Sequence, residues 1–237
     1  MAATALAAPG SPGLIDEAVY QRRVDDYLAF ATTAEHSSNP PGINAYLGRA
    51  QRDPEFTWPI ENVTVESLSA VFAQIDAWED TRDFRFMDLH WMLALGQGDT
   101  PMTQLSPEVI AAIDARMLAN RYAWDDPLPD DRLDNLWFWS ENHIVITRAI
   151  EYLAGQRYPD DTFAVTGLTG AEHLERAKPF ILEWITERAD LGFFEWHSNV
   201  YMLKNITPLH MLAELADDPE IVLAAAMALD LCLVDMA

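Results

Sequence analysis

The chain has 237 residues, half of them apolar, and its eight Trp, ten Phe and seven Tyr supply bulky side chains for a sizeable core. Fifteen Lys and Arg residues against 38 Asp and Glu residues give a net charge of −23, which repels nucleic acid and anionic membranes and excludes them as partners. The single cysteine, Cys232, excludes an intrachain disulfide framework and a zinc site built from cysteines.

The N-terminal residues MAATALAAPGSPG lack the basic segment and the long apolar run of a complete signal peptide. We predict a disordered tail or a signal-peptide remnant over residues 1–12, since Ala5-Leu6-Ala7 resembles the cleavage end of such a peptide. A remnant would indicate a secreted or periplasmic protein, and a plain tail a cytoplasmic one. No apolar run approaches the ~18–20 residues that a membrane span needs, so we expect no membrane partner.

Helical periodicity recurs along the whole chain, and the alternation typical of strands does not, so we predict an all-α fold. A first helix should follow Pro12-Gly13 and cover residues 14–33, until the polar, proline-rich HSSNPPG at 36–42 ends it. The next three predicted helices cover about 64–78, the stretch from the Thr81 cap to Gly96, and the stretch from Ser106-Pro107 to about Tyr122.

The C-terminal half follows the turn DDPLPDD at 125–131. Its four predicted helices cover residues 132–155, 170–190 after the cap Thr169, about 197–216 with a kink near Pro208, and 219 to the end after the cap Asp218. The short links predict antiparallel helical hairpins within one domain over residues 13–237. A bundle, an α-solenoid and an α/α toroid all fit this pattern, and the missing regular repeat weakens the solenoid.

Four consecutive polar residues, Ser140 to His143, interrupt the predicted helix over 132–155. Successive helical residues lie ~100° apart, so these four point around nearly the whole circumference. The flanking apolar residues also spread around the helix, which indicates an enclosed helix. An unsatisfied buried polar group costs ~1–3 kcal/mol, so each of the four needs a partner. A structural network explains any one of them, and a polar cavity explains the whole turn better.

A second polar group lies in GFFEWHSNVYMLKN, residues 192–205. On the predicted helix over 197–216, His197, Tyr201 and Lys204 stand at positions i, i+4 and i+7 and would share one face. Tyr201 alone would suit a core position. An imidazole, a phenol and an ammonium together favour a functional role.

Three motifs, WSENH at 139–143, GLTGAEH at 167–173 and EWHSNVY at 195–201, resemble a group of bacterial proteins with a WSENHQ signature. That group is associated with α/α-toroid enzymes similar to polysaccharide lyases, and the resemblance covers about residues 130–237. It implies a carbohydrate-active enzyme that cleaves a uronate-containing glycan by β-elimination, without a metal or an organic cofactor. Its substrate would be a polysaccharide or oligosaccharide.

The resemblance also implies catalytic roles. Glu141 and Asn142 would engage the uronate carboxylate, because quenching its charge makes the enolate that follows proton abstraction tolerable. His143 and Tyr201 would be the base and the acid of the elimination. Facing an anionic sugar, Glu141 would have to be protonated or bonded to His143. The further residues implied in substrate binding are His197, Lys204, Trp139 and Glu195.

The chain departs from the signature in two ways. Ile144 stands where the signature has Gln, and the chain ends inside a helix after too few hairpins to close a toroid. An incomplete toroid would leave an apolar flank of the last helix exposed, so we predict a homo-oligomer through that helix, or poor solubility. The residues expected on this flank are Ile221, Val222, Ala225, Leu229, Leu231 and Leu233.

Two other function classes stay open. A glycoside hydrolase of the same architecture would use Glu141 and Glu195 as its carboxylate pair. A non-catalytic, truncated helical protein would explain Ile144 and the missing helices. The stretch from Asp130 to Asp134 matches the DDxxD metal motif of terpene synthases, but it lies at a helix start, where acids are favoured anyway, and no second metal motif follows. Three histidines lie singly on helices and are interpreted as structural: His90, His173 and His210.

Overall fold

The computed structural model describes residues 16–33, 39–195 and 198–236. Within these ranges the chain forms nine α-helices and no strand, which confirms the all-α class. The helices are α1 (Glu17–Ala31), α2 (Pro40–Arg52), α3 (Ser69–Asp76), α4 (Arg82–Leu95), α5 (Pro107–Leu118), α6 (Glu141–Arg157), α7 (Gly170–Leu191), α8 (Met202–Leu215) and α9 (Pro219–Met236). The predicted tail over 1–12 lies outside the described residues.

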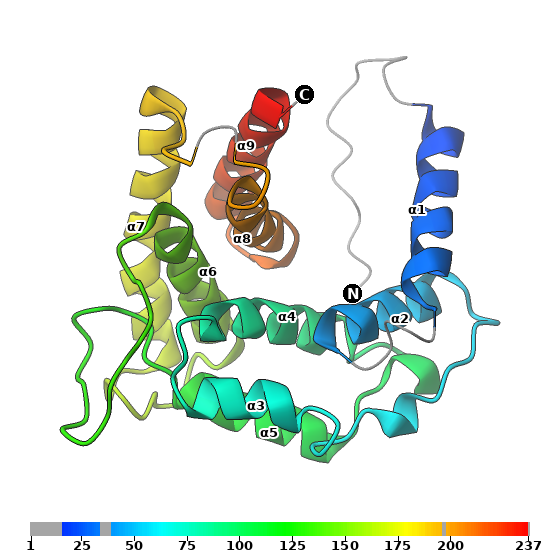
Figure 1. Ribbon diagram of the computed structural model, residues 1–237, viewed down its shortest axis with the longest axis horizontal. Coiled ribbons are helices and arrows are strands. Elements are labelled where there is room, and N and C mark those ends of the chain that lie inside the picture. Colours follow the sequence, from blue (N-terminus) through cyan, green and yellow to red (C-terminus); the bar gives the residue numbers. More distant parts are fainter. Residues whose placement is uncertain (1–15, 34–38, 196–197, 237) are drawn as a thin grey trace.

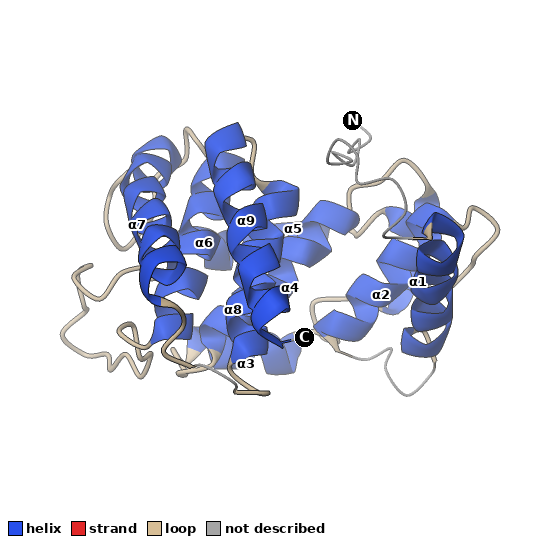
Figure 2. Ribbon diagram, turned by 90° about the horizontal axis from the view of Figure 1, so that it is seen from above, coloured by secondary structure: helices blue, strands red, loops and turns tan. Residues whose placement is uncertain are grey.

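The helix α4 connects two groups of helices (Figure 1). It runs above α3 and α5, with α6, α7, α8 and α9 grouped towards one end and α1 and α2 at the other. Figure 2, which looks down on the same arrangement, again places α1 and α2 at one end and α6, α7 and α9 at the other. Because α4 packs against α2, α6 and α8, it carries residues of the N-terminal half to the polar turn of α6.

One cluster of buried apolar side chains reaches from Ile43 in α2 to Cys232 in α9. Every residue of α6 from Val145 to Gly155 is buried, and this helix packs against α4, α7 and α8. The prediction of an enclosed helix is therefore confirmed after the polar turn and wrong before it, where Trp137 and Trp139 are 56% and 68% exposed. α1 has no buried residue and lies at the edge of the cluster against α2.

Glycines allow α6 and α7 to approach closely. A Cβ atom on Gly170 would overlap the carbonyl oxygen of Tyr158, and one on Gly155 would lie 2.5 Å from the carbonyl oxygen of Gly170. Thr169 starts α7 as predicted, in a capping box: its hydroxyl accepts from the backbone N–H of Glu172, whose carboxylate accepts from the N–H of Thr169. Local cap chemistry and close packing together fix this helix pair.

The predicted helix over 132–155 is wrong at its start, since α6 begins only at Glu141. Asp134 explains the difference: its carboxylate pairs with Arg82 at 2.5 Å and with Arg121 at 2.9 Å, and it also accepts from the backbone N–H of Leu136. These bonds tie the residues before Glu141 to α4 and to the segment after α5. A buried ion pair with two arginines outweighs the helical preference of a short segment.

The predicted helix over 197–216 is likewise shorter, because α8 begins at Met202 with Tyr201 as its N-cap residue. Tyr201 nevertheless has helical dihedral angles, and its carbonyl accepts from the N–H of Asn205, so Tyr201 and Lys204 keep a helical spacing. The backbone N–H of Tyr201 donates to the hydroxyl of Ser198 at 3.1 Å, in the turn that precedes the helix. His197 lies outside the described residues.

Three further differences concern the N-terminal half. The last residues of HSSNPPG, predicted only to end a helix, start α2: the Asn39 side chain accepts from the N–H of Gly42 at 2.9 Å, and Pro40 takes the first helical position. Residues 36–38 of this stretch lie outside the described residues. α3 covers only Ser69–Asp76, because Thr64 and Ser67 bond to each other's backbone in a turn. α5 ends at Leu118 rather than near Tyr122, where the chain turns to bond with the carboxylate of Asp126.

The last helix exposes an apolar surface, but not through all the predicted residues. Ile221 and Ala225 are fully buried, whereas Leu231 and Leu233 are exposed as expected. The exposed side chains that follow helical spacing form the apolar stripe of α9: Leu223, Met227, Leu231 and Val234, at 62%, 64%, 38% and 75% exposure. The exposed face of α9 is rotated about the helix axis relative to the predicted one, because Ile221 and Ala225 pack into the common core.

Candidate functional site

Glu141 opens α6, and its carboxylate holds three segments together. Oε1 accepts from Nη1 of Arg188 in α7 and from the backbone N–H of Phe194, both at 2.9 Å. Oε2 accepts from the N–H of Glu195 at 3.0 Å and from Nδ2 of Asn205 in α8 at 3.3 Å. The Glu141 and Arg188 side chains are each 3% exposed. Each oxygen therefore has two donors, and Glu141 fixes the turn at 194–195 against α6 instead of facing solvent.

Three buried polar atoms around this carboxylate lack a hydrogen-bond partner in the described part of the chain: Asn142 Nδ2, Arg188 Nε and Asn205 Oδ1. Arg188 and Asn205 bond to Glu141 directly, and Asn142 is its neighbour in the helix. Leaving such an atom unpaired costs ~1–3 kcal/mol, so native proteins contain few of them. Three around one helix start indicate a polar site that a ligand or water can satisfy.

His143, in the first turn of α6, pairs with an aspartate of α4. Its Nδ1 lies 2.5 Å from Oδ2 of Asp83, and the two side chains are 14% and 0% exposed. The other Asp83 oxygen accepts from the N–H of Phe84, whose ring stacks on the imidazole with 5.3 Å between centroids. Nε2 has no hydrogen bond to any described residue. An imidazole that donates from Nδ1 to a carboxylate has a basic Nε2, so this arrangement suits proton transfer.

Lys204 reaches the same place from α8. Its Nζ lies 4.2 Å from the centroid of the Phe84 ring, on which His143 also stacks. Tyr201, three residues before Lys204, is 51% exposed, so its side chain lies at the surface. The structure therefore brings Lys204 and His143 together through Phe84, and it places Tyr201 at the start of the helix that carries Lys204.

Two carboxyl groups near Lys204 and His143 keep their protons to higher pH than usual. Burial, together with the negative charge of Glu141, raises the pKa of Glu195. Burial raises the pKa of Asp88 in α4 to about 6, against the attraction of Arg85 and Lys204. A raised pKa leaves more of the protonated form than an ordinary carboxyl group keeps at the same pH, which favours a role as a proton donor.

Trp139, from the same WSENH motif, does not join this group. Its side chain is 68% exposed and lines a separate cavity of about 230 Å³, together with Arg148 and Phe180. The residues of the motif therefore divide between two places, one around His143 and one around Trp139.

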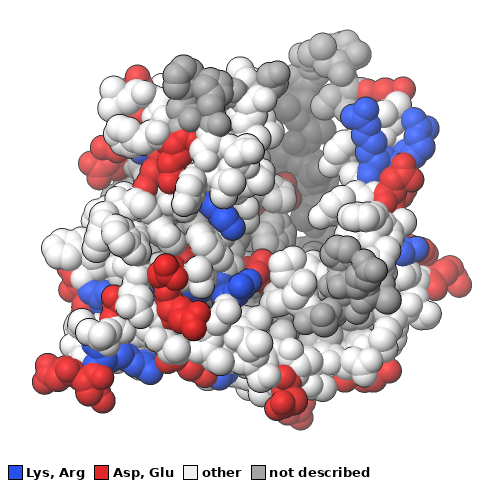
Figure 3. All heavy atoms as spheres, viewed as in Figure 1, with Lys and Arg blue, Asp and Glu red and all other residues white. Residues whose placement is uncertain are grey.

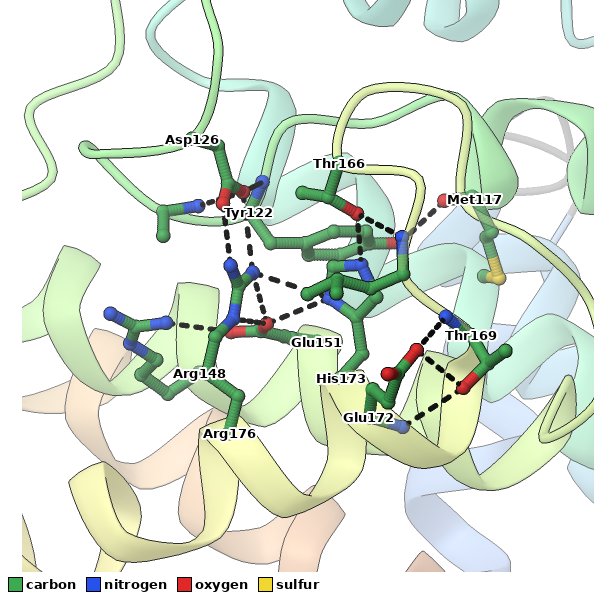
Figure 4. A network of polar contacts seen from close by, with 12 residues as sticks. Met117, Tyr122, Asp126, Arg148, Glu151, Thr166, Thr169, Glu172, His173 and Arg176 are labelled. Carbon is green, nitrogen blue, oxygen red and sulfur yellow. Dashed lines mark hydrogen bonds and ion pairs between the residues drawn. The ribbon is translucent and has the colours of Figure 1, made fainter.

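His173 belongs to a second polar network, shown in Figure 4. Its Nδ1 lies 2.8 Å from Oε1 of Glu151 and its Nε2 lies 2.8 Å from Oγ1 of Thr166. Glu151 also pairs with Arg148 and Arg176, and the side chains of Glu151 and His173 are 0% exposed. The network ties α6 and α7 to the loop before α7, in keeping with a structural role for His173.

Known protein families, curated proteins and solved structures were compared with the chain. None matches.

Other features bear on the alternatives. Asp134 of the DDxxD stretch is committed to its two arginines, and no group of His, Cys, Asp and Glu among the described residues could hold a metal ion. None of the helices in the described ranges is long and apolar enough to cross a membrane. Figure 3 shows acidic side chains spread over the visible face with fewer basic ones between them, as the net charge of −23 requires.

Asp83, Arg188 and Asn205 are members of the site that the sequence analysis missed. Asp83 lies in the first turn of α4 and Arg188 in the last turn of α7, where the helix dipole favours an acid and a base anyway. Nothing in the sequence therefore distinguishes Asp83 and Arg188 from the charged surface residues that are common at helix ends. Asn205 lies at the end of the GFFEWHSNVYMLKN stretch, and its place next to Lys204 was the one available signal.

Proposed function

We propose that the chain is an enzyme that removes a proton from a carbon next to a carboxylate, and that its substrate is a uronate-containing glycan cleaved by β-elimination. The contact that carries the proposal is the pair of His143 and the buried Asp83, because it provides an oriented base. The uronate substrate and an α/α-toroid type of helix arrangement rest on the resemblance of the WSENH and EWHSNVY motifs.

The proposed reaction needs a base and an acid. His143 Nε2 takes the proton α to the carboxylate, a carbon–carbon double bond forms, and the bond from the β carbon to the glycosidic oxygen breaks. Tyr201 gives its phenolic proton to the leaving oxygen and is reprotonated from solvent, to which His143 releases the proton that it took. The products are an unsaturated uronate end and a new hydroxyl end, and no water is consumed.

The substrate carboxylate needs positive charge or hydrogen-bond donors while the enolate forms. Lys204, at the Phe84 ring, offers an ammonium group. The unpaired Nδ2 of Asn142 is buried, so we assign Asn142 no direct contact with the glycan. Glu141 is engaged with Arg188 and with backbone N–H groups, so we assign it a positioning role in this proposal.

One contact favours a glycoside hydrolase as the second candidate. Asn205 Nδ2 lies 3.3 Å from an oxygen of Glu141 and 3.4 Å from an oxygen of Glu195, so the two carboxylates are close together. The raised pKa of Glu195 also suits a general acid. The burial of Glu141 under four donors argues against it as the second catalytic carboxylate, and we rank the hydrolase behind the lyase.

The two reactions differ in a product that can be measured. Elimination leaves a conjugated double bond that absorbs ultraviolet light, and hydrolysis does not. Alginate, pectate, glucuronan and glycosaminoglycans are incubated with the protein, and absorbance and new reducing ends are recorded. We expect both signals together from one substrate. Reducing ends without absorbance would favour the hydrolase, and silence in both assays from folded protein would refute both enzymes and favour the non-catalytic alternative.

Variants test the assigned roles. Asp83→Asn should lower kcat by roughly 100-fold or more, because the imidazole loses the carboxylate that orients it. Tyr201→Phe should abolish turnover without loss of glycan binding. The matched control is Tyr20→Phe in α1, since Tyr20 is 52% exposed, and it should leave the rate unchanged. Full activity of Asp83→Asn would remove His143 from the mechanism.

A further inference from the structure

The cavity beside Trp139 is separate from the group around His143. It has a volume of about 230 Å³ and lies between the segment after α5, the segment before α6, the first turns of α6, and Phe180 of α7. Five of its nine lining residues are aromatic, and Trp124 and Trp139, each 68% exposed, mark its open side. Apolar walls with a few polar groups are typical of sites for small molecules.

Arg148 is the one charged residue among the described residues that line this cavity. Its guanidinium lies 4.1 Å from the centroid of the Phe180 ring, and its side chain is 9% exposed. Within the described ranges it uses one donor, Nη1, in a bond of 2.8 Å to Glu151. Glu151 is shared with Arg176 and His173, as Figure 4 shows, so it does not belong to Arg148 alone. Arg148 therefore keeps N–H donors for an anion.

The charge of the lining is unusual for this chain. Acidic residues outnumber basic ones by 38 to 15, yet the nine residues that line the cavity include no carboxylate. The one carboxylate that pairs with Arg148, that of Glu151, does not line the cavity and is shared with Arg176 and His173. Because guanidinium and carboxylate match as planar, two-point partners, a carboxylate is the best-suited anion.

We propose that this cavity binds a small aromatic carboxylate, with its ring against Trp139 and Phe180 and its carboxylate on Arg148. The volume is below the ~300–1,000 Å³ of sites for drug-sized ligands, so it suits one ring with a short acidic side chain. A sugar acid shares the carboxylate, but its several hydroxyl groups need partners. The lining has two side-chain hydroxyls, those of Thr147 and Tyr122, and both already donate to backbone oxygens. The indole N–H groups of Trp124 and Trp139 can only donate, so few side-chain partners remain for several sugar hydroxyls.

The proposal does not depend on the chemistry at His143. None of the four residues Asp83, His143, Glu195 and Lys204 lines the cavity. The binding of an aromatic acid can therefore be present in a protein without lyase activity, and absent from an active one.

Intrinsic tryptophan fluorescence and calorimetry measure the binding directly, because Trp124 and Trp139 flank the site. The probes are phenylacetate, its neutral analogue phenylacetamide, and glucuronate. We expect saturable binding of phenylacetate, at least tenfold weaker binding of phenylacetamide, and weaker binding of glucuronate. Equal affinities for the acid and the amide, tighter binding of glucuronate, or no binding of any probe would each overturn the proposal.

Variants place the ligand in the cavity. Arg148→Gln should lower the affinity for phenylacetate at least tenfold while leaving that for phenylacetamide nearly unchanged. Because Arg148 also pairs with buried Glu151, this variant could fail to fold, and Trp139→Ala then carries the test, with an expected loss of roughly five- to tenfold from the missing stacking surface. Tyr27→Ala in α1 is the control, since this aromatic residue is 64% exposed and does not line the cavity, and it should change the affinity less than twofold. Trp137 is unsuitable as a control, because its ring lies 5.4 Å from that of Trp139. Equal effects of Trp139→Ala and Tyr27→Ala would refute the assignment.

Discussion

Glu141→Gln isolates the carboxylate that organises the start of α6. The substitution keeps the shape of the side chain and one acceptor oxygen, but it removes the negative charge and turns the other oxygen into an NH2 group. That group then faces the N–H of Glu195 and Nδ2 of Asn205, which were donors to the carboxylate. Asn205 can turn its amide and offer the unpaired Oδ1, whereas the backbone N–H of Glu195 has no such freedom.

The cost follows from the buried partner. Arg188 is 3% exposed, and without Glu141 its remaining ion pair is the one with Glu187 at 3.2 Å, whose side chain is 53% exposed. Breaking a buried ion pair by removing one partner costs ~3–5 kcal/mol. Against a total stability of ~5–15 kcal/mol this is a large loss. For a chain of this size it corresponds to a fall of roughly 6–20 °C in Tm.

Urea denaturation followed by tryptophan fluorescence and circular dichroism gives the change in free energy of unfolding. Glu187→Gln is the matched control, because it removes the exposed partner of the same arginine and should cost less than ~1 kcal/mol. Combined with Arg188→Met, Glu141→Gln should cost less than the sum of the two single changes, because they share one interaction. The reasoning fails if Glu141→Gln lies within ~1 kcal/mol of the wild type, or if Glu187→Gln is equally costly.

Two further predictions concern stability. Gly170→Ala should destabilise the fold by several kcal/mol, since its Cβ would overlap the Tyr158 carbonyl. The control is Gly48→Ala in α2, where the nearest atom to the new Cβ would be 4.0 Å away, and it should stabilise the fold by ~0.5–1 kcal/mol. Chemical denaturation of both variants measures the two changes. Burial lowers the pKa of His90 to about 3, so between pH 6 and pH 3 the unfolded chain binds a proton that the folded chain does not. As the pH drops, His90 should therefore lower the free energy of unfolding by ~1.4 kcal/mol per pH unit. His90→Leu should make the plot of unfolding free energy against pH less steep. The control is His210→Leu, at an exposed position, which should leave that plot unchanged.

Helix limits could be predicted where side chains within three residues decide them. Ser106 accepts from the N–H of Val109 before α5, and Thr169 and Glu172 form the capping box of α7. Both helices start where their sequence signals indicate. The enclosed character of α6 was also predictable, because its apolar residues spread around the whole helix.

Contacts between distant residues could not be predicted in the same way. Asp134 bonds to Arg82 across 52 positions, and this pair delays the start of α6. Asp83 lies 60 positions from His143, so no spacing in the sequence connects the imidazole with the carboxylate that it contacts. The sequence marked His143 as polar and enclosed, but its chemistry depends on how α4 packs against α6.

The apolar stripe of α9 has a consequence for the behaviour of the protein in salt solutions. Two copies that meet along Leu223, Met227, Leu231 and Val234 would bury apolar surface, but each brings a net charge of −23 with it. Their repulsion acts over a Debye length of ~30 Å at 0.01 M salt and ~3 Å at 1 M salt. Self-association should therefore be opposed in dilute buffer and favoured as ionic strength rises, the reverse of what an interface built on ion pairs would do.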